Sequence, residues 1–261
     1  MITMKIQKIE KKKRLYLLEC DNGDSLYVTE DTIVHFMLSK GMEISPEQLE
    51  SIKQFAQFSY GKNLALYYIS FQVRTQKQVY DYLKKHDLEN TIIQKIIEEL
   101  IKENWINDQK YVESFLRQNM TNGDKGPQLI KQKLMQKGIS DKIIEKAISE
   151  IDFYPIAEKV ALKMISRYQD KLPRKALQDK LTQLLINKGF SYDLVKAVNG
   201  NLSIETDQEN TLDLLEKEAD KQLRKLSKRY EGYALRQKLF QALYRKGYDS
   251  DDIQSLLSEI L

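Results

Sequence analysis

The chain has 261 residues and a formal net charge of +4, from 42 Lys and Arg residues against 38 Asp and Glu residues. No apolar stretch approaches the roughly 20 residues that a membrane span needs, and the charged N-terminal segment lacks the apolar run of a secretion signal. The single cysteine, Cys20, excludes an internal disulfide. We therefore expect a cytoplasmic protein without membrane contact. The scarcity of proline and glycine predicts that the chain is mostly α-helical.

The composition also argues against catalysis. Two histidines, His35 and His86, and one cysteine cannot supply the usual nitrogen and sulfur ligands of a zinc site. The sequence lacks the glycine-rich loops that cradle phosphates and the Gly-x-Ser-x-Gly turn of hydrolases. We predict that the chain is not an enzyme, that it has no catalytic residue, and that it needs no metal and no cofactor.

The first 60 residues are predicted to form a small β head. Residues 4–30 alternate between apolar and polar side chains, as strands do. Asn22-Gly23 between two such runs predicts a tight hairpin in which both residues have positive φ. The basic run over residues 11–14 predicts a second, solvated turn, with a nucleic-acid contact as the alternative. We expect a hairpin or three strands, a short helix over residues 31–38, and a longer helix that begins at the capping box Ser45-Pro46-Glu47-Gln48.

A recurring segment divides the rest of the chain. Leucine, two variable residues, lysine, glycine and an apolar residue follow one another from Leu134, Leu185 and Leu243. Leu83 starts a similar segment, in which Asp87 replaces the glycine. The four leucines are 51, 51 and 58 residues apart, and such a period is typical of duplicated structural units.

Each unit contains three predicted helices. The first is an apolar-striped segment upstream of the leucine, the second ends at the turn after it, and the third is an amphipathic helix opened by a polar residue. These opening residues are Asn90, Ser140, Ser191 and Asp249. We predict a β head over residues 1–60 and an elongated array of four helix-turn-helix-like repeats, over 61–110, 111–153, 154–203 and 204–261. Such arrays are generally binding surfaces.

Charge is sorted between the second and third helices of every repeat. The second helices carry net charges of +3, +4, +3 and +4, whereas the segments after the turns carry −3, −2, −3 and −4. This pattern suits repeated contact with phosphates or with a repeating protein partner. Helix dipoles and salt bridges between repeats are the simpler explanation. We expect a partner or DNA to contact these basic residues: Arg74, Lys77, Lys84, Lys85, Lys125, Lys131, Lys133, Lys137, Arg174, Lys175, Lys180, Lys188, Arg236, Lys238, Arg245 and Lys246.

Three segments of the first two repeats resemble a known family. Arg74–Leu88 is similar to the family's basic segment before the first turn. Trp105, Asp108 and Tyr111 match its aromatic-Ile/Leu-x-Asp-x-x-Tyr segment, and Lys125–Ile139 matches its most specific signature, Arg/Lys-Gly-Pro followed by Leu-x-x-Lys-Gly-Ile. The chain is identified as a member of the RecX family, in the longer form found in Gram-positive bacteria.

The resemblance implies a function. Proteins of the RecX family regulate the recombinase RecA: they lie in the groove of the RecA–DNA filament, bridge its protomers, and damp its recombinase, ATPase and coprotease activities. The resemblance therefore implies a regulator of homologous recombination and of the SOS response, with the RecA filament as its partner, and we expect a monomer. Two alternatives stay open: a direct DNA-binding protein built from helix-turn-helix-like units, and a repeat scaffold for another protein.

Overall fold

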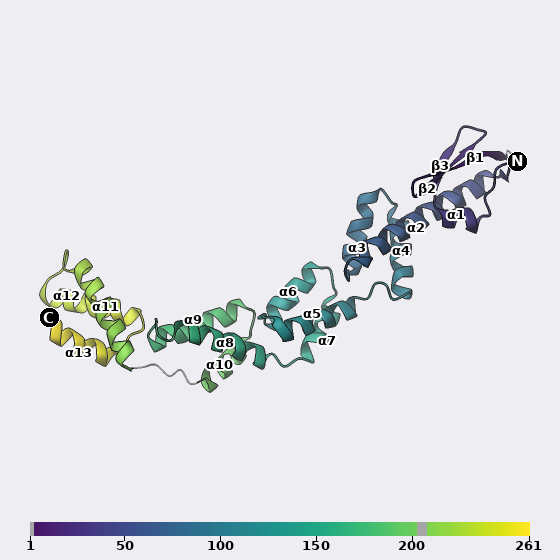
Figure 1. Cartoon of the computed structure of the whole chain (residues 1–261). Coiled ribbons are helices and arrows are strands. Elements are labelled where there is room, and N and C mark those ends of the chain that lie inside the picture. The colour runs from purple at the N-terminus through teal and green to yellow at the C-terminus, as the bar shows by residue number, and fades with distance from the viewer. Residues whose placement is uncertain (1–2, 203–207) are drawn as a thin grey trace. The chain divides into compact units, whose positions relative to one another are not determined.

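The computed structural model describes residues 3–202 and 208–261. Within these ranges the chain consists of a small N-terminal sheet followed by helices that are arranged in threes (Figure 1). The predicted class of a mostly α-helical repeat protein with a β head is thereby confirmed. The chain divides into two compact units, residues 1–115 with 134–147 and residues 116–133 with 148–261. The second repeat supplies residues to both units.

A four-stranded antiparallel sheet forms the head, in the order β3-β2-β1-β4. The prediction of two or three strands missed β4, which holds only two residues and is too short to show alternation. In β4, Ile44 is paired with Met4 of β1. The strands are β1 (Met4–Lys12), β2 (Leu15–Cys20), β3 (Ser25–Val28) and β4 (Glu43–Ile44).

The loop between β2 and β3 differs from the predicted hairpin turn. Gly23 has a φ of 89°, but Asn22 is not among the described residues with positive φ. The Asn22 amide instead donates to Asp24 Oδ2 at 2.8 Å, and the Asp24 N–H donates to Asn22 Oδ1 at 3.0 Å. The expectation of two positive φ angles was wrong because the loop spans residues 21–24 and is closed by side-chain hydrogen bonds.

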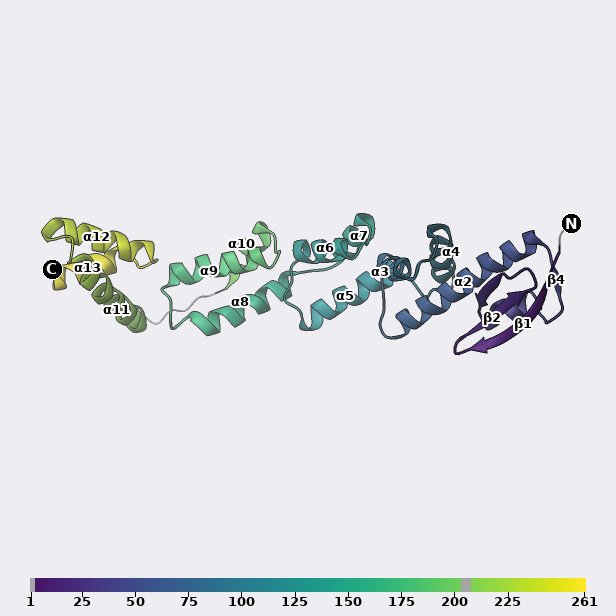
Figure 2. The ribbon, with the colours of Figure 1, turned by 90° about the horizontal axis from the view of Figure 1, so that it is seen from above.

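Helix α2 (Pro46–Ser70) is shared by the head and the first repeat (Figure 2). It begins at the predicted capping box, in which Ser45 and Gln48 each bond the other's backbone N–H. Ile52 in its first half is buried in the core of the head, whereas Ala65 in its second half is buried in the core of the first repeat. The predicted boundary between residues 60 and 61 therefore falls inside one continuous helix.

Helix α1 (Glu30–His35) belongs to the head. The other described helices take the first, second or third position of a repeat. The first helices are α2, α5 (Asp108–Asn122), α8 (Tyr154–Tyr168) and α11 (Gln208–Leu226). The second helices are α3 (Gln76–Leu83), which a 3-10 turn extends over Lys84–His86, α6 (Pro127–Gln136), α9 (Arg174–Asn187) and α12 (Gly232–Arg245). The third helices are α4 (Asn90–Lys102), α7 (Asp141–Ser149), α10 (Tyr192–Asn201) and α13 (Ser250–Ile260).

The repeat leucines anchor the last turn of each second helix. All four of them, Leu83, Leu134, Leu185 and Leu243, are completely buried. Because the exposed fraction of each is zero, each leucine gains the full benefit of apolar burial, about 1.5–3 kcal/mol relative to an exposed side chain. The sequence period therefore reports on a core position that recurs in every repeat.

Two of the residues predicted to open third helices act as caps. The Ser191 side chain accepts a hydrogen bond from the Leu194 N–H, and Asp249 accepts one from the Asp251 N–H. Asn90 is not a cap, because α4 begins at Asn90 itself and Glu89 precedes it. Its Oδ1 accepts a hydrogen bond from the Tyr80 hydroxyl at 3.2 Å instead, so this polar side chain is used between helices.

Candidate partner-binding surface

Successive repeats meet through the turn that ends each second helix. At the first junction, the Thr75 hydroxyl before α3 donates to the Lys137 carbonyl at the end of α6, at 2.8 Å. Gly138, with a φ of 82°, lies so close to the Lys77 side chain that an added Cβ would overlap it. The carbonyl end of one second helix thus faces the N–H end of the preceding one. This end-to-end orientation is favourable for both helix dipoles.

Two glycines allow the second junction to form. The Gly126 N–H donates to the Lys188 carbonyl at 2.7 Å, and the Gln128 N–H donates to the Gly189 carbonyl at 3.1 Å. A Cβ on Gly126 would lie 2.5 Å from the Gly189 oxygen, and a Cβ on Gly189 would collide with the backbone of Leu129. The Lys-Gly-Pro segment of one repeat and the Lys-Gly turn of the next are therefore a matched pair.

The junction between the third and fourth repeats follows the same plan. Gly247 has a φ of 90°, and a Cβ there would lie 2.8 Å from the Ala176 backbone nitrogen, in the first turn of α9. The Lys175 ammonium lies 5.0 Å from the centre of the Tyr244 ring, which adds a cation–π contact across the junction. All three glycine turns thus dock on the first turn of the preceding second helix.

These junctions explain why Asp87 can stand in the first repeat where the other repeats have glycine. Asp87 has a φ of 55°, in the left-handed region that aspartate tolerates better than most residues. No helical repeat precedes it, and its side chain is exposed. The other three turns need glycine because atoms of the preceding second helix occupy the space of a side chain. These atoms are backbone at Gly189 and Gly247, and the Lys77 side chain at Gly138.

Two of the residues that carry the family resemblance contact elements of the first junction, Asp108 across the junction and Tyr111 within the second repeat. Asp108 Oδ1 accepts a hydrogen bond from the Gln76 N–H at 2.9 Å, at the N-terminus of α3. The Tyr111 ring faces the Lys137 ammonium, 5.9 Å from the ring centre. Trp105 is different, because 55% of its surface is exposed. Asp108 and Tyr111 therefore have structural roles, whereas Trp105 is an aromatic side chain that a partner can reach.

Most of the predicted basic residues have partners within the chain. The Lys188 ammonium forms an ion pair with Asp124, and Lys246 Nζ lies 2.8 Å from Glu218 Oε1. Arg74 and Lys180 lie over tyrosine rings, at 4.1 and 4.4 Å from the ring centres. The others with a partner or a close packing contact are Lys77, Lys84, Lys125, Lys131, Lys137, Lys175 and Arg236.

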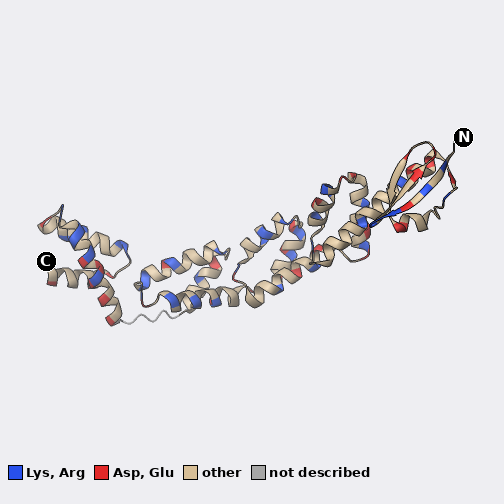
Figure 3. Cartoon of the chain, turned by 45° about the horizontal axis from the view of Figure 1, so that its top comes forward, with Lys and Arg blue, Asp and Glu red and all other residues tan. Residues whose placement is uncertain are grey.

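Figure 3 colours all lysines and arginines of the chain blue, and a smaller set of those predicted as binding residues is left to face solvent or a partner. Within the residues that the structure describes, these side chains make no hydrogen bond, ion pair or ring contact, and all but the half-buried Lys133 are exposed. Every one of them belongs to a second helix or to its turn. They are Lys85, Lys133, Arg174, Lys238 and Arg245.

Sequence reasoning did not find the acidic partners of the turn lysines. Asp124 and Lys188 are 64 residues apart in the chain, and only the docking of the third repeat on the second brings them together. Glu218 lies on α11 and meets Lys246 at the end of α12. The regular charge sorting indicated that contacts between elements were possible, but it carried no information about which pairs form.

Two carboxyl groups at the junctions have altered acidity. The pKa of Asp124 is lowered, chiefly because the Lys188 ammonium donates a hydrogen bond to it. The pKa of Asp108 is raised, because burial disfavours its charged form more than the hydrogen bond from the Gln76 N–H favours it. Both carboxyl groups are engaged by groups of the junctions themselves, so their shifts are explained by structural contacts.

Other features bear on the kind of site this is. In the described ranges, no three His, Cys, Asp or Glu side chains are grouped so that they could hold a metal ion. Every helix in the same ranges is too short or too polar to cross a membrane.

Comparison with known proteins identifies the family. Sequence models of the first, second and third three-helix domains of RecX match residues 62–100, 107–148 and 208–257. A regulatory protein RecX from Streptococcus uberis is 99% identical over 258 residues, which cover 99% of this chain and 100% of that protein. The chain belongs to the RecX family. A RecX from Streptococcus pyogenes serotype M1 is 59% identical over 258 residues, again covering 99% of this chain and all of its relative.

Solved structures of the RecX family share the fold. A crystal structure of regulatory protein RecX, 30% identical, superposes with a TM-score of 0.63 and covers 76% of this chain and 100% of that one. RecX from Lactobacillus salivarius, 38% identical, superposes with a TM-score of 0.54 and covers 56% of this chain and 96% of its own. The relatives are named regulatory proteins, and the three matched domains correspond to the first, second and fourth repeats of this chain.

Proposed function

We propose that this RecX-family chain binds along the RecA–DNA filament, bridges successive protomers, and damps the recombinase, ATPase and coprotease activities of RecA. The observation that carries the proposal is the repeated junction, in which a glycine turn docks on the preceding second helix. Because each repeat is joined to the next by the same kind of contact, the chain presents equivalent basic second helices at intervals. A binding surface with a repeat suits a partner that is itself a repeating polymer.

Electrostatics supports the same proposal. Those of the predicted basic residues that have no intramolecular partner in the described residues all lie at second helices, whereas the segments after the turns carry a net negative charge. Charges arranged in this way steer association and set register more than they add affinity. Partners with alternating patches of the opposite sign are therefore favoured over a uniformly charged surface.

The proposal is tested with the purified chain and RecA filaments on single-stranded DNA. At stoichiometric ratios, the chain is expected to lower the DNA-dependent ATPase rate and to shorten or stiffen the filaments seen by electron microscopy. An ATPase rate and a filament length that do not change on addition of the chain would refute it. The protein should be tested over a range of salt concentrations, because its charged contacts weaken as salt is raised.

Direct DNA binding is the second candidate. It is favoured by Lys85, Arg174, Lys238 and Arg245, which are exposed and lie at second helices of helix-turn-helix-like units. A gel-shift assay without RecA separates the two candidates. DNA binding that falls steeply with salt would support this alternative. Binding that appears only when RecA coats the DNA would support the filament proposal.

A further inference from the structure

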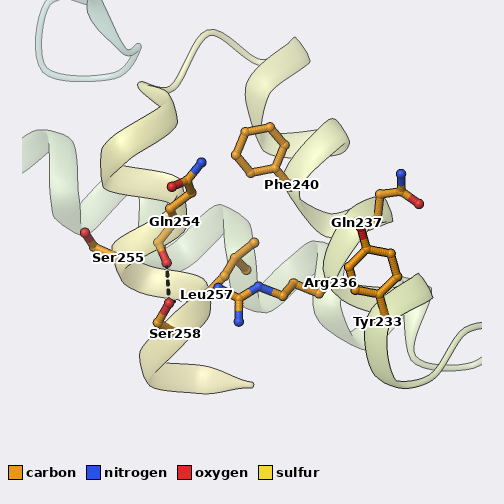
Figure 4. Close-up of a pocket in the computed structure, with 8 residues that line it drawn as sticks. All are labelled: Tyr233, Arg236, Gln237, Phe240, Gln254, Ser255, Leu257 and Ser258. Carbon is orange, nitrogen blue, oxygen red and sulfur yellow. Dashed lines mark hydrogen bonds between the residues drawn. The ribbon is translucent and has the colours of Figure 1, made fainter.

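The fourth repeat contains an open groove between α12 and α13. The groove has a volume of about 620 Å³ (Figure 4). Tyr233 and Phe240 project from α12, Leu257 lies on the facing helix, and the Arg236 side chain extends from α12 toward α13. Arg236 donates a hydrogen bond to the Ser258 hydroxyl at 2.9 Å. Tyr233 is 82% exposed, so the groove combines accessible aromatic surface with one positive charge.

The groove of the fourth repeat is equivalent to a groove in the first repeat. Counted from the repeat leucine, Leu257 takes the place of Ile97 on the third helix. On the second helix, Arg236, Gln237 and Phe240 take the places of Gln76, Lys77 and Tyr80. In the first repeat this groove is bordered by a residue from the next repeat, because Gly138 is part of its lining.

The third repeat makes a similar contact at the start of its second helix. The hollow beside the start of α9, which includes Lys175 and Gln178, is lined on its other side by Tyr244 and Gly247 of the following repeat. A turn at the C-terminal end of a second helix, closed by a glycine with positive φ, therefore lies beside the start of the preceding second helix in both cases. Within the described residues, no residue of another repeat lines the equivalent groove of the fourth repeat.

The N-terminus of α12 offers backbone N–H groups for the same kind of contact. Glu231 makes no side-chain capping hydrogen bond. Within the described residues, the backbone N–H groups of Gly232, Tyr233 and Ala234 meet no acceptor. At the corresponding end of α6, the Gln128 N–H is satisfied by a carbonyl of the next repeat. The groove and the helix start together form the surface on which a fifth repeat would dock.

We propose that this groove receives the C-terminal turn of an α-helix of the partner protein, closed by a glycine in the left-handed conformation. The turn would seat on Tyr233 and Phe240 as Gly138 and Gly247 seat on their neighbours, with its carbonyls facing the N–H groups of α12. The inference rests on the proposed function, since the RecA filament is taken as the partner. The partner's helix turn then takes the position on the fourth repeat that the next repeat takes at the other junctions.

A second copy of this chain is a poorer occupant. The turn that an incoming first repeat would offer carries Asp87, and its Cβ would stand where glycine is needed in all three internal junctions. Head-to-tail contacts that do not close would also produce open filaments of this protein. Asp87 therefore disfavours self-assembly through this groove and leaves it to a partner with a glycine turn.

The experiment measures binding of the full chain to RecA filaments on single-stranded DNA. Gln254→Trp fills the groove from an exposed position, and Ala234→Glu places a carboxylate against the incoming carbonyls. Gln118→Trp, an exposed position on α5 that does not line the groove, is the matched control. Both groove variants are expected to weaken binding by about 10-fold or more, and the control by less than about 2-fold, because contacts at the centre of an interface dominate its affinity. Circular dichroism checks that all variants are folded.

The outcomes separate the two proposals. If the unmodified chain does not bind the filament, both the proposed function and the assignment of RecA as the occupant of the groove are wrong. If the chain binds and the groove variants bind equally well, only the groove assignment is wrong. In a separate experiment on the unmodified groove, a photo-crosslinker in place of Tyr233 identifies the occupant by mass spectrometry. An adduct on a helix C-terminal turn of RecA supports the proposal, whereas an adduct on DNA, on another part of RecA or on a second copy of the chain overturns it.

Discussion

At the scale of single residues, glycine at the end of each second helix meets two requirements at once. Gly189 has a φ of 85° and lies directly against the backbone of Leu129 in the preceding repeat. Positive φ alone could be met by aspartate, as Asp87 shows with its φ of 55°. The neighbouring backbone is therefore the stricter requirement, and it depends on contact between repeats.

Substitution of this glycine should loosen the second junction. Gly189→Ala combines a strained positive φ with a collision at the Leu129 backbone, and we expect it to lower the free energy of unfolding by roughly 1–3 kcal/mol. Gly200→Ala, in α10, meets open space and should raise that free energy by about 0.5–1 kcal/mol. Urea unfolding followed by circular dichroism measures both. Equal effects of the two substitutions would contradict this account of the junction.

The ion pair of Asp124 and Lys188 should make the second junction sensitive to acid. The folded-state pKa of Asp124 lies below its usual value of 3.8, so the stability from the pair is fully present above that pH and is lost as the pH falls through the lower folded value. The stability difference between the chain and Asp124→Asn should thus be present at about pH 6 and shrink as the pH falls below 3.8. Asp220→Asn, exposed and without a hydrogen bond or ion pair in the described residues, serves as the control. A difference that grows as the pH falls would contradict the prediction.

At the scale of elements, the second helices have two roles that their charge alone does not distinguish. Lys188 holds the third repeat to the second, and Lys246 holds the end of α12 to α11 within the fourth repeat. Lys238 and Arg245 face outward. Sequence analysis predicted all of them as one set, because helical spacing and charge are local properties. The division depends on where the carboxylates and aromatic rings of other elements come to lie.

Reversal of the outward charges should therefore affect binding without affecting the fold. Lys238→Glu together with Arg245→Glu is expected to weaken filament binding by about 10-fold at low salt, and the loss should shrink as salt is raised. The matched control is the pair Lys163→Glu and Lys217→Glu, exposed positions on the first helices α8 and α11, with the same change of net charge. Fluorescence anisotropy of labelled filaments gives both affinities. Similar losses in the two double variants would show that net charge matters and position does not.

At the scale of the whole chain, α2 couples the head to the first repeat. Its first half is buried with the sheet, and its second half supplies Ala65 to the core of the first repeat. Because a helix loses cooperativity when it is cut, the place of truncation matters. A chain that starts at residue 45 keeps the capping box and the whole of α2, whereas one that starts at residue 61 does not.

We expect the shorter truncation product to be the less stable one. The chain of residues 61–261 should melt at a lower temperature than the chain of residues 45–261, because its first repeat loses the Phe58 side chain and the first half of α2. Differential scanning calorimetry measures the two transitions. Identical melting temperatures would show that α2 is not a shared element. The same two proteins, compared in filament binding, reveal whether the β head contributes to binding.

The sequence by itself determined the properties that depend on near neighbours. Helical periodicity, the capping box at Ser45, the repeated leucine and the sorting of charge all rest on residues a few positions apart or on a plain period. These were sufficient for the fold class and the family. The missed strand β4 and the local closure of the loop by Asn22 show where very short or side-chain-driven elements escape such patterns.

Only the tertiary structure decided which of these residues meet. Gly126 against Gly189 and Asp124 with Lys188 both depend on how one repeat docks on another. The partners are more than 60 residues apart at these contacts, and local spacing carries no information at that separation. The charges behind the net charge of +4 follow the same division. The sequence sorts them among the helices, and packing decides which of them are left without an intramolecular partner.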